Sequence, residues 1–197
     1  MSLRPEISGF SLNNMDALFG TKDEHLLTDL LCEFDKKITF RDPELTGQSH
    51  AILRRAIDER PRWPDLDMEG EPHVFAAIIL AQHGQEHIKT DSNLWAMPSL
   101  WDFFRQHFSQ IPSPGRKYLR MFFEGRGIFA RNIETSWSFY GFLDHSELRM
   151  LLASLREFED AEPAREGQPF RSEFFGKFTG WLTAIESNGK DLWFYCS

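Results

Sequence analysis

The residues of this chain with the clearest spacing for chemistry are His83, Glu86 and His87, in the segment His-Gly-Gln-Glu-His. This segment matches H-x-x-E-H, the inverted zincin pattern, in which two histidines bind zinc and the glutamate activates a water molecule. Because residues four apart share one face of a helix, both imidazoles would reach one metal ion. The pattern therefore predicts a zinc-dependent hydrolase, with His83 and His87 as ligands and Glu86 as the general base. Glu162 and Glu166 are candidates for the third ligand.

The same five residues have a structural interpretation as well. Gly84 weakens a helix at the point where ligand geometry has to be rigid. The pattern specifies only three positions, so chance matches are frequent. The alternative is a polar C-terminal turn, since histidine at the end of a helix interacts favourably with the helix dipole. We therefore rank the zinc hydrolase second among the candidate functions.

A further candidate site is a basic stretch between residues 116 and 131, in which aromatic residues such as Tyr118 alternate with cations. Such a stretch could clamp phosphates or an acidic peptide while its rings stack on bases. Alternatively, the rings face the core and the cations are solvated, and the net charge of −8 favours this because an acidic protein repels nucleic acid. Binding of nucleic acid or of an acidic partner is therefore the third hypothesis. The candidate partner-binding residues are Arg116, Lys117, Arg120, Arg126 and Arg131.

Familiar nucleophile and nucleotide-binding motifs do not occur in the sequence, which contains no G-x-S-x-G, no P-loop and no G-x-G-x-x-G after a strand. The two cysteines, Cys32 and Cys196, fit neither C-x-x-C nor a metal-binding spacing. We expect both to be buried free thiols, and a single long-range disulfide between them is the alternative. Cys32 follows His25 by seven residues on one helical face, but its leucine-rich neighbours predict burial rather than reactivity.

Hydrophobic periodicity predicts that most of the chain is helical. Two capping boxes, Thr21 with Glu24 and Asp144 with Glu147, each mark the start of an amphipathic helix. The segment 73–87 contains a run that is apolar on nearly all sides and predicts a central, buried helix. Further helices are expected from Ser49, from Pro98 or Ser99, from Ser113 to Glu124, and along residues 170–185. The predicted apolar face of the last helix consists of Phe170, Phe174, Phe178, Trp181, Leu182 and Ile185.

The last helix is expected to stop at Asn188-Gly189 and to lead into a short aromatic strand over residues 192–196. Residues 2–11 form a second extended segment, which Pro5 would restrict to the edge of a sheet. We expect these two segments to pair. The predicted fold class is α+β: a mainly helical single domain over residues 1–197, with a small β-sheet that includes the C-terminal strand. The abundance of rings, 19 Phe and 6 Trp, predicts an aromatic core.

Three stretches carry a family resemblance. Residues 16–23, Asp-Ala-Leu-Phe-Gly-Thr-Lys-Asp, lead into the leucines of the first long helix, like a Gly-Ser/Thr-x-Asp helix entry. Residues 141–144, Gly-Phe-Leu-Asp, are similar to a Gly-[Tyr/His]-Leu-Thr helix start, although Phe142 and Asp144 depart from it. Residues 180–182, Gly-Trp-Leu, and the closing aromatic strand complete the set. Together they resemble an uncharacterised family of small stand-alone bacterial cytoplasmic proteins, a domain of unknown function, and the resemblance implies no catalytic residue.

The lack of a complete catalytic set in the sequence, the many helix caps and core stripes, and the net acidity together favour a binding function. The net charge of −8 suits a basic partner and disfavours contact with nucleic acid or with an anionic membrane. The longest apolar run, Val74 to Ala81, is too short to span a bilayer, and the N-terminus lacks the apolar core of a signal peptide, so we expect a cytoplasmic protein. The leading hypothesis is a non-catalytic protein-binding module, immunity-like or regulatory, whose partner is a protein. Zinc is the one cofactor considered, and only under the hydrolase hypothesis.

Overall fold

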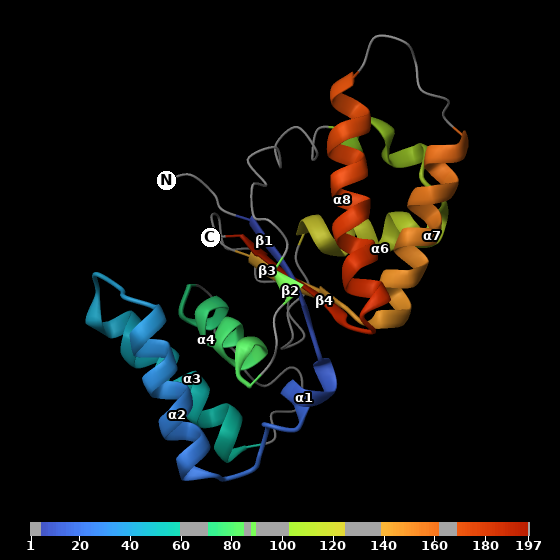
Figure 1. Ribbon diagram of the computed structural model, residues 1–197. Coiled ribbons are helices and arrows are strands. Elements are labelled where there is room, and N and C mark those ends of the chain that lie inside the picture. The colour runs from blue at the N-terminus through green and yellow to red at the C-terminus, as the bar shows by residue number, and fades with distance from the viewer. Residues whose placement is uncertain are drawn as a thin grey trace.

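The computed structural model describes residues 5–59, 71–84, 88–89, 103–124, 139–161 and 169–196. They form a mainly helical α+β fold with a small antiparallel sheet that includes the C-terminal strand, as the sequence predicts (Figure 1). The described helices are α1 (Leu12–Asp16), α2 (Glu24–Lys37), α3 (Pro43–Asp58), α4 (Glu71–Gln82), α6 (Ser113–Glu124), α7 (His145–Ala161) and α8 (Pro169–Ser187), with a helical segment over residues 103–107 that continues into the 3-10 turn η2 (Phe108–Gln110). The described strands are β1 (Pro5–Phe10), β2 (Ile88–Lys89), β3 (Phe139–Leu143) and β4 (Asp191–Cys196).

The sheet has the strand order β2-β1-β4-β3, and every neighbouring pair is antiparallel. Its centre is formed by the two ends of the chain, with Pro5 opposite Cys196 and Phe10 opposite Asp191. This confirms the predicted pairing of the N-terminal segment with the C-terminal strand. The expectation of an edge strand is wrong, because β2 pairs with the other side of β1. Pro5 is tolerated in an inner strand because it is the first residue of that strand.

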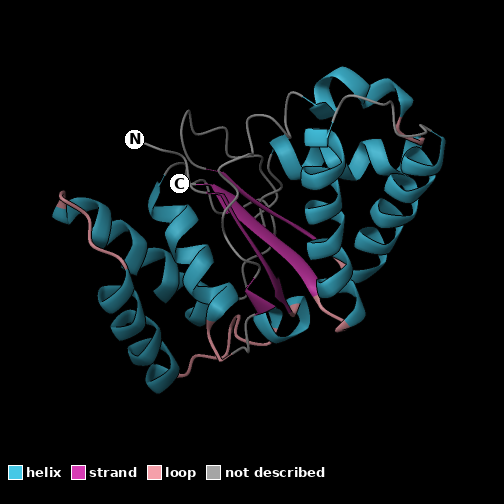
Figure 2. Cartoon of the chain, turned by 45° about the horizontal axis from the view of Figure 1, so that its top comes forward, coloured by secondary structure: helices cyan, strands magenta, loops and turns pink. Residues whose placement is uncertain are grey.

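Helices cover both faces of the sheet (Figure 1 and Figure 2). Successive side chains of β4 point to opposite faces: Trp193 packs into a core with α1–α4, and Phe194 packs into a core with α6–α8. In β1, Phe10 and Ile7 divide between the two cores in the same way. A strand covered on both faces has to be apolar at successive positions, which explains the continuous aromatic run at the C-terminus. We call α1–α4 the N-terminal layer, and residues 103–110 with α6–α8 the C-terminal layer.

Helix α4 is the central element of the N-terminal layer. From Val74 to Ala81 all of its residues except Phe75 are buried, which confirms the predicted buried helix. It packs against both α2 and α3. Within the ranges that the structure describes, none of the helices combines the length and apolar character that crossing a membrane requires.

The cap of α2 differs from the predicted one. Asp23 is the N-cap, and its carboxylate accepts hydrogen bonds from the N–H groups of His25 (2.9 Å) and Leu26 (3.1 Å). The hydroxyl of Thr21 instead donates to the carbonyl of Leu18 at 3.1 Å. The capping box at Thr21 is therefore wrong, since a carboxylate two residues later occupies the position that accepts the first N–H groups of the helix.

Helix α3 begins earlier than the sequence predicts. It starts at Pro43 behind the cap Asp42, and Ser49 lies inside it. Ser49 is fully buried, and its hydroxyl oxygen lies 3.0 Å from the carbonyl oxygen of Leu45 and 3.2 Å from that of Pro72. A serine whose hydroxyl donates a hydrogen bond to a carbonyl of the preceding turn can lie inside a helix. The interpretation of Ser49 as a helix start is therefore wrong.

The start of α7 is the predicted capping box. Asp144 Oδ1 accepts the N–H of Glu147 at 2.9 Å, and the N–H of Asp144 donates to Glu147 Oε2 at 3.1 Å. Asp191, the first residue of β4, adds a second carboxylate there: it accepts the N–H of His145 in α7 (2.8 Å) and that of Leu12 in α1 (2.7 Å). One side chain therefore accepts a hydrogen bond from a backbone N–H group in the first turn of a helix in each layer.

Helix α8 follows the predicted pattern with one change. Phe178, Leu182 and Ile185 are buried as expected, and Phe175, which the predicted face omits, is buried as well. Gly189 has a φ of 65°, the left-handed conformation expected at the end of this helix. The helix start predicted at Pro98 or Ser99 lies outside the described residues.

Candidate functional site

The helix expected to carry the zinc pentad ends before the pentad does. Helix α4 stops at Gln82, the N–H of His83 still bonds to a carbonyl in its last turn at 2.9 Å, and Gly84 has a φ of 65°. This left-handed residue terminates the helix. The expectation of a helix to about His87 is therefore wrong, and the argument that both imidazoles share a helical face no longer applies. Because Glu86 and His87 lie outside the described residues, the zinc site itself stays a prediction.

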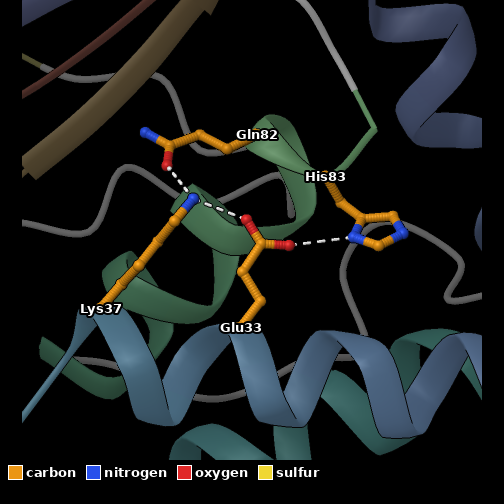
Figure 3. A network of polar contacts seen from close by, with 4 residues as sticks. All are labelled: Glu33, Lys37, Gln82 and His83. Atoms are coloured by element: carbon orange, nitrogen blue, oxygen red, sulfur yellow. Dashed lines mark hydrogen bonds and ion pairs between the residues drawn. The ribbon is translucent and has the colours of Figure 1, made fainter.

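His83 belongs to a polar network between two helices (Figure 3). Its Nδ1 lies 3.0 Å from Oε2 of Glu33 on α2. The second carboxylate oxygen, Oε1, accepts a hydrogen bond from Lys37 Nζ at 2.6 Å, and this ammonium group also lies 3.3 Å from Oε1 of Gln82. The network ties the end of α4 to the last turns of α2, and Nε2 of His83 lies on the side of its ring that faces away from Glu33.

The protonation state of Glu33 follows from these contacts. Burial raises the pKa of its carboxyl, but hydrogen bonds from Lys37 and His83, together with their charges, outweigh burial and hold that pKa below its ordinary value of 4.5. Glu33 is therefore a carboxylate at neutral pH and can only accept hydrogen bonds. The side chains of Glu33 and His83 are each 23% exposed, so solvent screens this pair only in part.

A second carboxylate–imidazole pair joins α2 to α3. Asp35 Oδ1 lies 2.8 Å from Nε2 of His50, whose ring also meets Phe34 edge-on at 5.3 Å between centroids. This pair is more open to solvent, with the side chain of Asp35 58% exposed and that of His50 31% exposed. The two histidines therefore use different ring nitrogens, Nε2 in His50 and Nδ1 in His83.

Three of the five predicted partner-binding cations lie on one side of α6. Arg116, Lys117 and Arg120 occupy positions i, i+1 and i+4, and Lys117 and Arg120 are exposed while Arg116 is partly exposed. Tyr118 and Leu119 occupy the opposite side of the helix and are buried in the C-terminal core. The structure thus presents three cations on the outer surface of a helix whose inner side is packed. We call these three residues the basic side of α6.

The aromatic part of that prediction has a different outcome. Tyr118 is buried at 6% exposure, so its ring is not available to stack on a base, and the alternative of core packing holds for this residue. The ammonium group of Lys117 lies 5.2 Å from the centroid of that ring. Arg126 and Arg131 lie outside the described residues.

Cys32 is exposed on α2, so the expectation that it is buried is wrong. The buried stripe of α2 contains Leu27 and Leu30, and Cys32 lies on the opposite side of the helix with the exposed His25. Neighbours in sequence point to different sides of a helix, so adjacent leucines do not predict burial. The side chain of Cys196 lies outside the described residues.

Metal ligands do not cluster in the part of the chain that the structure describes, where no group of three or more His, Cys, Asp or Glu side chains is placed to hold an ion. Glu162 and Glu166, the candidate third ligands, lie outside that part. Sequence reasoning missed Glu33 and Lys37 as members of the site. Their spacing of four was a detectable signal for an ion pair, but no local pattern links Glu33 to His83, 50 residues further along the chain.

Comparisons with known proteins add no name to this site. The chain matches no protein-family model, no curated protein and no solved structure. The resemblance to an uncharacterised bacterial family stays a prediction. The function is therefore argued from the basic side of α6 and from the Glu33–His83 network.

Proposed function

We propose that this chain is a non-catalytic protein-binding module of an immunity-like or regulatory kind. The observation that carries the proposal is the basic side of α6, with Arg116, Lys117 and Arg120 on the surface of a protein whose net charge is −8. Clustered charge on a packed helix steers a partner of opposite charge and determines its orientation. The buried Tyr118 and Leu119 hold the helix against the core, so the three cations project from a fixed support.

The local charge on α6 supports an acidic segment of the partner as the contacting group. Exposed charges act over about 10 Å at ordinary salt concentrations, so the residues at the contact matter more than the total charge of the chain. The basic partner expected from the net charge stays a prediction for the remaining surface. A bacterial origin and a cytoplasmic location also belong to this proposal, and their support is the sequence resemblance.

The use of polar side chains in the fold supports a role without catalysis. The carboxylates of Asp23, Asp42, Asp144 and Asp191 accept hydrogen bonds from the first N–H groups of helices. Glu33 is engaged by Lys37 on one oxygen and by His83 on the other. Carboxylates used in this way stabilise helix ends and helix contacts.

The test is cross-linking and capture from the native host, with the wild-type chain beside a variant of reversed charge on α6. We expect one protein at stoichiometric level near physiological salt, lost when the three α6 cations become glutamate and weakened at high salt. A matched control reverses three exposed cations of the N-terminal layer and should retain the partner. The α6 variant changes Arg116, Lys117 and Arg120, and the control changes Lys36, Arg41 and Arg54.

Two outcomes would contradict this proposal. The absence of any stoichiometric partner would remove the binding module, and equal loss in both charge variants would remove α6 as its contact surface. Salt-dependent binding of oligonucleotides that disappears with the α6 variant would instead support the nucleic-acid hypothesis, since phosphates bind the same cations.

The zinc-dependent hydrolase is the second candidate because a carboxylate on one ring nitrogen of histidine is typical of zinc ligands. His83 has this arrangement with Glu33. The measurement is the metal content of untagged protein, purified without chelators, by plasma mass spectrometry. Near-stoichiometric zinc that is lost in both His83→Ala and His87→Ala would support the hydrolase. Protein that takes up no zinc even when zinc is offered would exclude it.

A further inference from the structure

An exposed apolar side chain of α7 lies next to the basic side of α6. Among the side chains that the structure describes, Met150 on α7 is the one large apolar group that is exposed, at 41%. The hydroxyl of Tyr118 on α6 donates a hydrogen bond to its Sδ at 3.8 Å. The ammonium group of Lys117 lies 5.2 Å from the centroid of the same tyrosine ring. A cation of α6 and the exposed thioether of α7 therefore lie beside one buried ring.

The packing of α6 against α7 fixes the position of Met150 relative to these cations. One turn away from Met150, Gly115 lies so close to Ser154 that an added Cβ atom would be 2.3 Å from the Cβ of that serine. The N–H of Gly115 also donates to Ser154 Oγ at 3.0 Å. These two successive contacts, Gly115 with Ser154 and Tyr118 with Met150, hold the helices antiparallel and close together. The cations and the thioether are therefore arranged before a partner binds, which lowers the cost of binding.

The acidic side chains of α7 leave the charge near Met150 to the cations of α6. Glu147 lies one turn before Met150, but its Oε2 accepts the N–H of Asp144 at the start of the helix, at 3.1 Å. The exposed Glu157 lies seven residues after Met150 on the same side of the helix. That spacing is about 10 Å along the axis, which is about one screening length at ordinary salt concentrations. Positive charge and apolar surface are therefore combined at Met150.

We propose that the basic side of α6 and Met150 form one docking surface, which binds an acidic segment of a partner protein that carries an apolar side chain next to its carboxylates. The carboxylates pair with Lys117 and Arg120, and the apolar side chain covers Met150. Methionine suits this role because its flexible thioether adapts to the shape of a bound group. Nucleic acid fits the cations but supplies no aliphatic side chain for Met150. This inference rests on the proposed binding function and adds the chemistry of the bound segment.

The first experiment selects peptides from a random library displayed on phage. The full-length wild-type chain is the target, and the library is depleted on the variant in which Arg116, Lys117 and Arg120 become glutamate. We expect the enriched peptides to combine acidic residues with an adjacent Leu, Ile, Phe or Met. Enriched peptides that are acidic but have no apolar residue would overturn this inference and leave α6 as the contact of the proposed function. The absence of enriched acidic peptides would overturn it as well, while capture from the native host tests the binding module separately.

The second experiment measures the affinity of an enriched peptide for variants of Met150, by isothermal titration calorimetry. We expect Met150→Ala to lower the affinity about five- to tenfold, because apolar surface buried in the complex is lost. Met150→Leu is the matched control and should restore most of the affinity. Replacing the apolar residue of the peptide by serine should weaken binding to the wild-type chain and have little further effect in Met150→Ala.

Two results of this experiment would overturn the role of Met150. One is an affinity that Met150→Ala leaves unchanged. The other is a methyl resonance of Met150, in protein labelled with ¹³C at the methionine methyl groups, that does not shift when the peptide saturates the wild-type chain. A single-stranded oligonucleotide that binds more tightly than every enriched peptide, and is lost with the α6 variant, would assign the surface to nucleic acid instead.

Discussion

Both helical layers pack around an apolar core, and they differ in the side-chain contacts that are added to it. In the N-terminal layer, polar side chains join one helix to the next, with Glu33 bonded to His83 and Asp35 bonded to His50. In the C-terminal layer, aromatic rings from three helical segments contact one another with centroid distances between 5.4 and 6.2 Å. These rings belong to Phe103, Phe104, Phe158, Phe175 and Phe178.

This difference separates stability from candidate chemistry. Buried rings contribute several kcal/mol each, whereas partly exposed ion pairs contribute about 1 kcal/mol or less. The C-terminal layer therefore offers a rigid support for the cations of α6. The N-terminal layer orients two imidazoles at little cost in stability, and its polar contacts can be altered without unfolding the chain.

The largest expected effect is that of Phe104→Ala. Phe104 is 1% exposed and contacts Phe175 and Phe178, so its removal leaves a cavity in the C-terminal core. We expect a loss of about 3–5 kcal/mol in the free energy of unfolding, measured by urea denaturation. Phe40→Ala is the comparison, because Phe40 contacts Phe34 from a partly exposed position in the N-terminal layer and should cost less. Equal losses would show that the burial of the ring does not determine the cost in stability.

Gly115→Ala should also destabilise the C-terminal layer. A Cβ atom at Gly115 would lie 2.3 Å from Cβ of Ser154, where α6 meets α7 and the N–H of Gly115 donates to Ser154 Oγ at 3.0 Å. We expect the separation of the two helices to cost about 3 kcal/mol. Gly47→Ala is the matched control in α3, where a Cβ meets nothing within 4 Å. That change should stabilise the chain by about 0.5–1 kcal/mol in the same denaturation experiment.

Asp191→Ala tests the side chain that connects the two layers. It removes the acceptor of the N–H groups of Leu12 and His145, and we expect a loss of about 2 kcal/mol. Asp42→Ala, which removes a single N-cap bond to Glu44, should cost about half as much. Hydrogen exchange should show faster opening of both α1 and α7 in Asp191→Ala. Faster exchange in one helix alone would show that the layers are not joined at this point.

The smallest expected effect is that of Glu33→Gln, at about 0.5–1 kcal/mol. The pKa of Glu33 is lower in the folded chain than its ordinary value of 4.5, so below that value the unfolded state binds more protons. The contribution of the Glu33 carboxylate to the free energy of unfolding is therefore complete at pH values above the ordinary pKa. It disappears as the pH falls through the lowered pKa of the folded chain. Urea denaturation at several pH values should show the difference between wild type and variant closing in acid. A difference that grows in acid would contradict this sign.

Much of the fold could be predicted from local patterns. The capping box of Asp144 and Glu147, the buried helix from Val74 to Ala81 and the terminal aromatic strand all depend on residues close in sequence, and the structure confirms them. The errors at Thr21 and Ser49 arose where a hydroxyl and a nearby carboxylate could each serve as the N-cap of a helix. In the structure the caps are Asp23 and Asp42. Which of them caps a helix depends on where the neighbouring helix lies, and a local pattern does not contain that information.

The candidate sites also contain features that local sequence predicts and features that it does not. The sequence by itself determined that α6 carries cations on one side and apolar residues on the other, because the helical period alone separates them. Only the tertiary structure decided that Gly84 ends α4 and that Glu33 meets His83. A helix end releases the following residues from the helical period, and a contact between residues 50 positions apart depends on how α2 and α4 pack. Packing of distant helices, rather than spacing along the chain, determines which nitrogen of His83 faces a carboxylate.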